Sequence, residues 1–214
     1  MLDPSRVAGL YAIADTQYLN DARLLPAVSD AIAGGARVIQ YRDKTHDALT
    51  RLAQAKKIAA LCRQHSVLFL VNDDVALAKE SGADGVHLGR DDMPLSQARA
   101  VLGARAIIGV SCYHELARAL KAENEGGDYI AFGRFFPSRT KPGAVHADVE
   151  LLREAKKKLC IPIVAIGGIT PENGASLLGG GADALAVIEG VFGQPDMRAA
   201  AQCYARLFNM GAGS

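Results

Sequence analysis

The chain alternates short apolar runs with longer alanine- and leucine-rich segments, about eight times from end to end. Many of these runs are rich in β-branched residues and have no polar alternation, which is typical of strands that are buried on both faces. The predicted strands are Leu10–Ala14, Val38–Tyr41, Leu68–Val71, Gly85–Leu88, Ile107–Ser111, Tyr129–Gly133, Ile163–Ile166 and Ala184–Ile188.

The segments between these runs are predicted to be helices that pack against the strands. Leu116, Ala119 and Leu120 mark one apolar face by their spacing. For the helix that follows the second strand, the expected face consists of Leu49, Leu52, Ala53, Lys56 and Ala60.

Three near-repeats indicate that one module is used several times: "GGARVIQ" from Gly34, "SGADGVHL" from Ser81 and "GGADALAVI" from Gly180. Each predicts a helix that ends at glycine, which tolerates a left-handed backbone, followed by a strand. Eight such modules in 214 residues favour an α/β fold, a closed (β/α)8 TIM barrel, as a single domain over residues 1–214. An open flavodoxin-like sheet needs fewer strands and would leave the last modules unassigned.

Charge and cysteine usage exclude several classes of partner. The chain has 24 basic and 23 acidic residues, without the basic excess expected for binding nucleic acid or a membrane surface. No apolar run approaches the roughly 18 residues of a membrane helix, and the start lacks the pattern of a secretion signal. The four cysteines are scattered and form no CxxC pair, so we expect a reduced, cytoplasmic setting.

Polar side chains follow nearly every predicted strand, at the end where (β/α)8 barrels carry their reacting groups. Because side chains alternate along a strand, Gln40 and Arg42 share a face while Tyr41 points the other way. The other groups that end strands are Lys44, Asn72 to Asp74, Arg90 to Asp92, Ser111, Gly167, Gly168, Glu189 and the loop "FFPSRTKPG".

These groups are suited to a metal-bound diphosphate. Arg42, Lys44 and Lys141 are candidates for holding a highly charged phosphate group. Asp73, with either Asp91 or Asp92, is a candidate for binding Mg²⁺, which takes few carboxylates and completes its shell with water and phosphate oxygens. The metal would neutralise charge that develops on the diphosphate.

A second anion site is predicted after the seventh strand, in "AIGGITPEN". Glycines let backbone N–H groups approach an anion. Thr170 is a good N-cap for the following helix, and Pro171 fits its first position. Phosphate sites after strands seven and eight are frequent in this fold, so a phosphomonoester is expected here.

Each motif alone also has a simpler explanation. Asp73 or Asp74 can cap a helix, and the same holds for Asp91 and Asp92, so one acid of each pair can cap while the other binds metal. His87 lies within a strand and is expected to be a packed histidine rather than a ligand. The joint interpretation depends on all these signals falling at one end of the predicted strands.

Six motifs, in this order and spacing, resemble the thiamine-phosphate synthase family: "QYRDK", "VNDD", "GVHLGRDDMP", "IIGVSCY", "GRFFPSRTKPG" and "IPIVAIGGITPEN". The resemblance runs from Tyr11 to about Phe192. It implies a transferase that joins hydroxymethylpyrimidine diphosphate to a thiazole phosphate and releases diphosphate. It also implies a dissociative path assisted by Mg²⁺, in which the C–O bond breaks before the C–N bond forms.

The resemblance also implies roles for individual residues. It assigns the magnesium ion to Asp73 and Asp92. Catalytic roles fall to Arg42, Lys44, Ser111 and Lys141. The pyrimidine diphosphate would contact Gln40, Arg42, Lys44, Asn72, Ser111 and Lys141, and the thiazole phosphate would contact Ser138, Thr140, Gly168 and Ile188. Tyr41, Asp43, Arg139 and Glu189 complete the candidate substrate-binding set.

Two positions depart from the family pattern. Ser138 stands where the family commonly has threonine and keeps the hydroxyl. Glu189 stands where serine is frequent, so we expect its carboxylate to point away and only its backbone N–H to serve the phosphate. We also expect the loop from Phe136 to Ala147 to close over the site.

Two alternatives remain at this point. A thiazole tautomerase-like barrel would keep the phosphate site but lack the full diphosphate-binding set. A non-catalytic protein that binds a phosphate ligand would need no metal acids. The expected partners are small molecules, and a homo-oligomer is left open.

Overall fold

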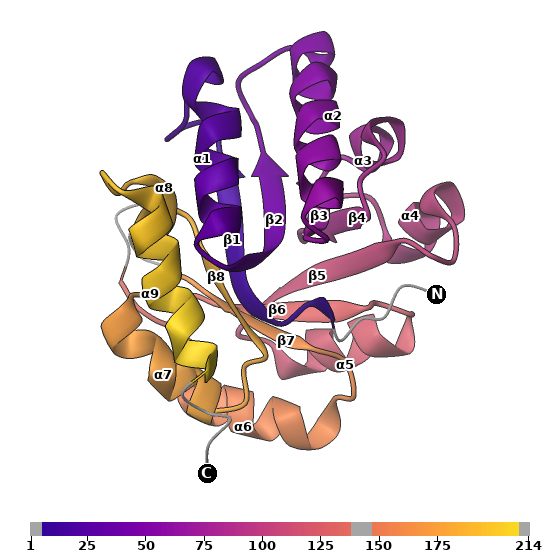
Figure 1. The fold of residues 1–214 in the computed structure, drawn as a ribbon. Helices are drawn as coiled ribbons and strands as arrows, with labels where there is room; N and C mark the ends of the chain where they lie inside the picture. Colours follow the sequence, from indigo (N-terminus) through magenta and orange to yellow (C-terminus); the bar gives the residue numbers. More distant parts are fainter. Residues whose placement is uncertain (1–5, 138–146, 210–214) are drawn as a thin grey trace.

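The computed structural model describes residues 6–137 and 147–209. Its eight strands are parallel, pair in chain order, and close where the last pairs with the first (Figure 1). The predicted (β/α)8 barrel is therefore confirmed. The strands are β1 (Gly9–Asp15), β2 (Ala36–Arg42), β3 (Leu68–Asn72), β4 (Gly85–Leu88), β5 (Ile107–Tyr113), β6 (Tyr129–Gly133), β7 (Ile163–Ile166) and β8 (Ala184–Val187).

Helices follow the strands and surround the barrel (Figure 1). None of those in the described part of the chain is long and apolar enough to cross a membrane. The helices are α1 (Asp21–Ala33), α2 (Ala48–Gln64), α3 (Val75–Ser81), α4 (Leu95–Leu102), α5 (Leu116–Asn124), α6 (Val149–Lys158), α7 (Pro171–Gly179), α8 (Glu189–Phe192) and α9 (Met197–Asn209).

The predicted strands agree with the observed ones closely. Gly85–Leu88, Tyr129–Gly133 and Ile163–Ile166 have the predicted bounds, and the other five differ by at most two residues at either end. The agreement is good because buried parallel strands are continuous apolar runs that end where polar loops begin.

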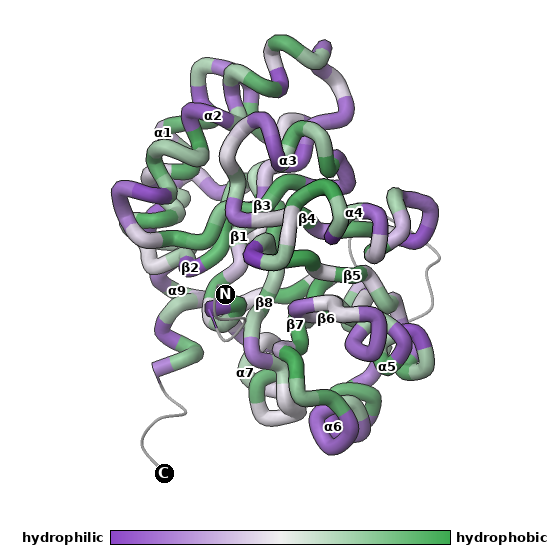
Figure 2. Tube along the Cα trace, turned by 90° about the vertical axis from the view of Figure 1, so that its right-hand side faces the viewer, coloured by the Kyte–Doolittle hydropathy of each residue, from purple (hydrophilic) through white to green (hydrophobic). Residues whose placement is uncertain are grey.

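Two apolar cores lie on opposite faces of the barrel strands, one inside the barrel and one beneath the helices. On β2, Val38 points into the barrel, and Ile39 points out toward the helices. On β3, Leu68 and Leu70 face inward while Phe69 faces outward, as side-chain alternation requires. Figure 2 shows hydrophobic residues along the central strands and hydrophilic residues on the outer helices such as α6.

The predicted apolar face of α2 is wrong except for Leu52, which is partly buried and packs against the core. Leu49 is 82% exposed, and Ala53, Lys56 and Ala60 are also exposed. The buried residues of this helix are Ala55, Ile58, Ala59 and Cys62. Alanines occur on both sides of α2, so its periodicity does not select the buried face, and packing on β2 and β3 does.

The near-repeats have a structural explanation at the turns from helix to strand. Gly35, Gly82 and Gly181 follow α1, α3 and α7 with φ values of 104°, 72° and 110°. A left-handed backbone at these three positions confirms the expectation for glycine at the helix ends.

An aspartate just before a strand ties neighbouring strands together at the far end of the barrel. The Asp84, Asp128 and Asp183 carboxylates each accept a hydrogen bond of 2.8 Å from a backbone N–H. The donors are Phe69 on β3, Ile108 on β5 and Ile163 on β7. These contacts satisfy strand N–H groups opposite the mouth, where barrel residues serve stability rather than chemistry.

Candidate active site

The carboxyl ends of the eight parallel strands form one rim, which we call the mouth. Asp15 at the end of β1 lies beside Arg42 at the end of β2 in the strand register. Asn72 at the end of β3 likewise lies beside His87 on β4. Segments far apart in the sequence therefore supply neighbouring side chains.

Two cations of the predicted diphosphate site lie at the mouth, and each is bonded to a carboxylate. Lys44 Nζ lies 2.6 Å from Asp73 Oδ2. Arg42 Nη1 lies 2.5 Å from Oδ2 of Asp15, a residue that is 2% exposed. Asp15 holds the guanidinium in place, so it supports Arg42 rather than facing a ligand.

The structure distinguishes the two aspartates after β3. Asp74 caps α3 by accepting a hydrogen bond from the Leu77 N–H at 2.9 Å, and it pairs with Arg51 at 2.7 Å. Asp73 does not cap the helix and has a left-handed φ of 63°. The turn therefore directs Asp73 to Lys44 and leaves Asp74 to the helix.

Asp92 lies close enough to Asp73 for the two carboxyl groups to shift each other's pKa, although the two follow different strands. Its Oδ2 also accepts a bond of 2.6 Å from the Gly89 N–H. The expectation that Asp91 or Asp92 caps the next helix is wrong, because α4 begins after Pro94 without a side-chain cap. The turn from Gly89 instead directs Asp92 to Asp73.

Two carboxylates this close cannot both carry charge without cost. Burial raises the pKa of Asp92, and the Asp73 carboxylate beside it raises the pKa further. Burial opposes ionisation of Asp73 as well, but the Lys44 ammonium and the Asp92 hydrogen bond outweigh it and lower the Asp73 pKa. A cation between the two acids would relieve this repulsion.

A cavity of about 370 Å³ opens beside this cluster, between the loops that follow β2 and β3. Arg51 of α2 reaches it, a residue that the sequence motifs did not indicate. The Arg51 Nε is buried and has no hydrogen-bond partner among the described residues. The lining residues are Asp43, Lys44, His46, Arg51, Asn72, Asp73 and Asp74.

Tyr41 and Asp43 brace the loop that carries Lys44. The Tyr41 side chain points outward, as its alternation with Gln40 predicts, and its hydroxyl contacts Asp43 Oδ2 at 2.8 Å and Gln54 Oε1 at 2.6 Å. The buried Asp43 carboxylate also accepts bonds from the Thr45 N–H at 2.8 Å and the His46 N–H at 3.1 Å. These two side chains are engaged within the wall of the site.

Replacement of Asp43 by asparagine is expected to make the free energy of unfolding depend less on pH in the acid range. Burial acts to raise the Asp43 pKa, but hydrogen bonds from Thr45, Tyr41 and His46 hold it well below its usual range. A carboxylate whose folded-state pKa is lowered stabilises the fold above the unfolded value of about 4 and loses that effect as the pH falls further.

Urea unfolding between pH 7 and pH 2.5 measures this effect. The free energy of unfolding should fall more steeply below about pH 4 in the wild type than in Asp43→Asn, which should be the less stable protein at pH 7. Parallel acid limbs for the two proteins would contradict the assignment.

Gln40 and Ser111 lie deeper, where the barrel interior meets the mouth. The Gln40 amide nitrogen donates to the Tyr11 hydroxyl at 2.5 Å. Ser111 Oγ lies 2.9 Å from His87 Nε2. His87 stacks on Tyr129 inside the barrel, with ring centroids 5.5 Å apart, which confirms the expectation of a packed histidine. No cluster of three or more His, Cys, Asp or Glu side chains that could hold a metal occurs among the described residues.

The opposite side of the mouth is built from glycine turns. Gly167 and Gly168 have φ values of 104° and 67°. A Cβ on Gly168 would lie 2.6 Å from the Phe136 carbonyl oxygen and 2.5 Å from that of Pro137, so only glycine fits there. The backbone after β7 therefore lies directly against the loop after β6.

The predicted anchor residues after β7 and β8 occupy helix starts. Thr170 precedes α7, which begins at Pro171 as predicted, and the Thr170 N–H donates to Asn173 Oδ1 at 2.9 Å. Ile188 precedes the short α8, whose first residue is Glu189. Ser138, Arg139, Thr140 and Lys141 lie outside the described residues, as does most of the loop that was expected to close.

The barrel and its mouth define a class: a (β/α)8-barrel protein whose rim presents cations, paired carboxylates and glycine turns to an anionic ligand. Comparison with known proteins makes the class specific. The family model described as thiamine monophosphate synthase matches residues 10–191.

Individual relatives agree with the family model. A thiamine-phosphate synthase from Nitrosococcus oceani is 53% identical over 204 residues, covering 95% of this chain and 94% of the relative. One from Chromobacterium violaceum is 51% identical and covers 96% and 98%. The solved thiamine phosphate pyrophosphorylase from Pyrococcus furiosus superposes with a TM-score of 0.89 at 35% identity, over 98% and 99% of the two chains.

The chain belongs to the thiamine monophosphate synthase family, and it is accordingly an enzyme of the transferase class. The resemblance inferred from the six motifs is confirmed. Motif inspection missed Asp15, Arg51, Tyr11 and Tyr129. Asp15 could have been found from its place at the end of the first apolar run, "LYAIAD".

Proposed function

We propose that this enzyme joins hydroxymethylpyrimidine diphosphate to a thiazole phosphate, giving thiamine phosphate and diphosphate. In this reaction the bond between the methylene carbon and the diphosphate oxygen breaks, and its electron pair leaves with the diphosphate. The lone pair of the thiazole nitrogen then forms the new C–N bond. The contact of Lys44 with Asp73, which itself lies close to Asp92, is the observation that carries this proposal.

The leaving group determines what the site must do. A departing diphosphate gains negative charge as the C–O bond breaks, and fixed positive groups lower the barrier because they need no reorganisation. Lys44 and Arg42 supply such charge at the mouth, with Lys141 as the third cation predicted from the sequence. Asp15 keeps Arg42 oriented through their 2.5 Å ion pair.

The paired acids fit a magnesium ion. Asp73 and Asp92 are close enough to shift each other's pKa, and they would hold Mg²⁺, which is commonly bound by one or two carboxylates together with water and substrate phosphates. When bound, the metal supplies charge neutralisation for the diphosphate oxygens. Lys44 is bonded to Asp73 when no metal is present. With the metal bound to Asp73, Lys44 would be free to turn toward the phosphate.

The remaining residues divide between the two organic groups. Gln40, Asn72 and Ser111 bind the pyrimidine end, while Tyr41 and Asp43 act by supporting the Lys44 loop. Gly168, Ile188 and the backbone N–H of Glu189, with Ser138 and Thr140, hold the thiazole phosphate. Arg139 stays a substrate-binding candidate. No general base is needed, because the attacking ring nitrogen carries a free lone pair.

A tautomerase-like activity is the competing hypothesis, and the metal acids disfavour it. A tautomerase needs a phosphate anchor. It does not need the paired carboxylates and two cations that this chain places at the opposite side of the mouth. The reduced cysteines, all four of them unbonded, support a cytoplasmic setting for the reaction.

An assay of diphosphate release tests the proposal. Purified protein should release diphosphate and form thiamine phosphate in equal amounts when both substrates and Mg²⁺ are present. Chelation of the metal by EDTA should lower the rate by at least about a hundredfold, with recovery on adding excess Mg²⁺. Absence of thiamine phosphate in the complete mixture would overturn the synthase proposal, and turnover of a thiazole substrate alone would favour the tautomerase.

A further inference from the structure

A continuous chain of hydrogen bonds crosses the barrel interior beneath the mouth. It runs from Gln40 Nε2 to Tyr11 Oη at 2.5 Å, on to Tyr129 Oη at 3.0 Å, and then to His87 Nδ1 at 2.8 Å. His87 Nε2 completes it at Ser111 Oγ, 2.9 Å away. The chain thus joins two predicted substrate-binding residues through three residues with no assigned role.

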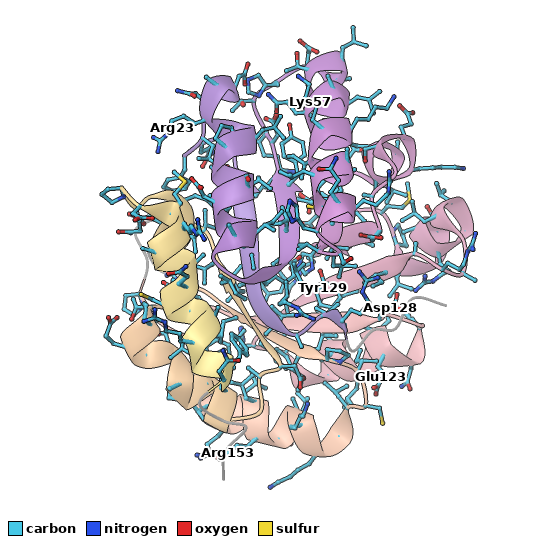
Figure 3. All side chains as sticks on the ribbon, viewed as in Figure 1. Arg23, Lys57, Glu123, Asp128, Tyr129 and Arg153 are labelled. Carbon is cyan, nitrogen blue, oxygen red and sulfur yellow. The ribbon has the colours of Figure 1, made fainter. Side chains whose placement is uncertain are left out.

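Three of the five links of this chain are buried, and His87 and Ser111 are partly buried. Tyr129 is fully buried, Tyr11 is 1% exposed and Gln40 is 3% exposed. Tyr129 lies toward the middle of the barrel in Figure 3, whereas Arg23, Lys57 and Arg153 lie at the periphery. Buried polar networks of this kind are costly unless every member is bonded, and these members are bonded to one another.

The direction of each bond follows from counting protons. Gln40 donates to Tyr11, so the single Tyr11 proton must go to Tyr129, and the Tyr129 proton must go to His87 Nδ1. Burial raises the pKa of both phenols, which keeps each hydroxyl protonated. A neutral His87 then carries its proton on Nε2 and donates it to Ser111.

The neutral form of His87 is the one that its surroundings favour. An imidazolium would donate from both nitrogens and would conflict with the Tyr129 hydroxyl. Among the described residues the two ring nitrogens contact only the Tyr129 and Ser111 hydroxyls, and no carboxylate is bonded to either of them.

We infer that this chain makes Ser111 an obligate hydrogen-bond donor toward the mouth and leaves Gln40 to present its carbonyl oxygen as an acceptor. Ser111 accepts from His87, so its own proton has no partner in the chain and points to the ligand. Gln40 Oε1 accepts no hydrogen bond from the described residues, so it is left as an acceptor for a ligand. Tyr11, Tyr129 and His87 are positioning residues.

This polarity selects a ligand class. A planar heteroaromatic ring that offers an acceptor to Ser111 and a donor such as an amino group to Gln40 matches it, and a ring with these two functions exchanged does not. The catalytic consequence rests on the proposed function, in which an aminopyrimidine binds here. The opposite direction of the chain would make Ser111 a donor to His87 and an acceptor only toward the ligand.

The tautomer of His87 tests the direction without any substrate. In a two-bond ¹H–¹⁵N spectrum of the labelled protein at pH 7, His87, assigned by its loss in His87→Gln, should show a protonated Nε2 and an unprotonated Nδ1. A protonated Nδ1, or an imidazolium, would overturn the inference. The tautomer measurement does not depend on the diphosphate-release assay. It would therefore still test the direction of the chain if the proposed function were wrong.

Tyr129→Phe breaks the chain and keeps the aromatic ring. We expect the second His87 tautomer to appear and kcat/KM for the pyrimidine substrate to fall by about tenfold. Tyr204→Phe is the matched control, because it removes another buried hydroxyl, bonded to the Ile169 carbonyl oxygen at 3.0 Å, outside the chain. If Tyr129→Phe and Tyr204→Phe changed the tautomer spectrum equally and lowered kcat/KM equally, Tyr129 would have only a structural role.

A double-mutant cycle tests whether Tyr129 acts through Ser111. If it does, Tyr129→Phe should cost less than about twofold in a Ser111→Ala background, since the hydroxyl that it orients is already gone. Additive losses would contradict the positioning role. His87→Gln keeps an N–H donor for Ser111 and should retain at least about tenfold more activity than His87→Leu.

Discussion

Replacement of Asp73 by asparagine is expected to lower kcat about a thousandfold, equivalent to ~4 kcal/mol of transition-state stabilisation, and to leave the barrel folded. The substitution removes one of two acids proposed to bind the metal and the carboxylate that orients Lys44. Asparagine tolerates the left-handed backbone that Asp73 adopts, with φ 63°, so the change adds no strain.

The neighbouring Asp74 provides a matched control. Asparagine caps helices as well as aspartate does, so Asp74→Asn keeps the α3 cap and loses only the ion pair with Arg51. We expect at most about a threefold loss of kcat in this variant. The measurement is kcat at saturating concentrations of both substrates across a magnesium titration, with urea unfolding as the check on folding. Similar losses in the two variants would mean that the charge at Asp73 has no special role.

Gly85→Ala is expected to destabilise the fold by at least about 3 kcal/mol. A Cβ at this position would lie 1.7 Å from the carbonyl oxygen of Ile107 and 2.8 Å from its backbone nitrogen. Gly85 and Ile107 are register partners on β4 and β5, so the clash is between two backbones that cannot separate without opening the barrel. Because β4 also carries His87 and leads to Asp92, activity should fall with stability.

Gly179→Ala is the control for this prediction. Gly179 is exposed at the end of α7, and a Cβ there meets nothing within 4 Å. Alanine favours a helix over glycine by up to about 1 kcal/mol, so this variant should match or exceed the wild type. Chemical denaturation followed by circular dichroism compares the three proteins, and a Gly85→Ala variant as stable as the wild type would show that β4 and β5 can separate.

Some features of the site were predictable because they depend on local chemistry. The strand ends could be located from apolar runs that stop at polar residues, and the start of α7 from Thr170 and Pro171. The left-handed glycines followed from the helix-to-strand repeats. These signals are contained within a few neighbouring residues.

Other features depend on partners distant in the chain. The choice between Asp73 and Asp74 depends on a backbone turn and on Lys44, which lies 29 residues away in the sequence. The α2 face was mispredicted because alanines lie on both sides of the helix, and only contact with the barrel selects Ala55 and Ile58. The buried chain from Gln40 to Ser111 joins five strands, and no spacing in the sequence encodes it.

The order of short buried strands and helices was enough to determine the barrel, its direction and the rim at which charge collects, because parallel strands in sequence must end at one face. Only the tertiary structure decided which carboxylate at each strand end turns to the mouth and which is used for capping. It also decided the polarity of the barrel interior, because the direction of a hydrogen bond is fixed by the partner at its other end, and here that partner comes from another strand.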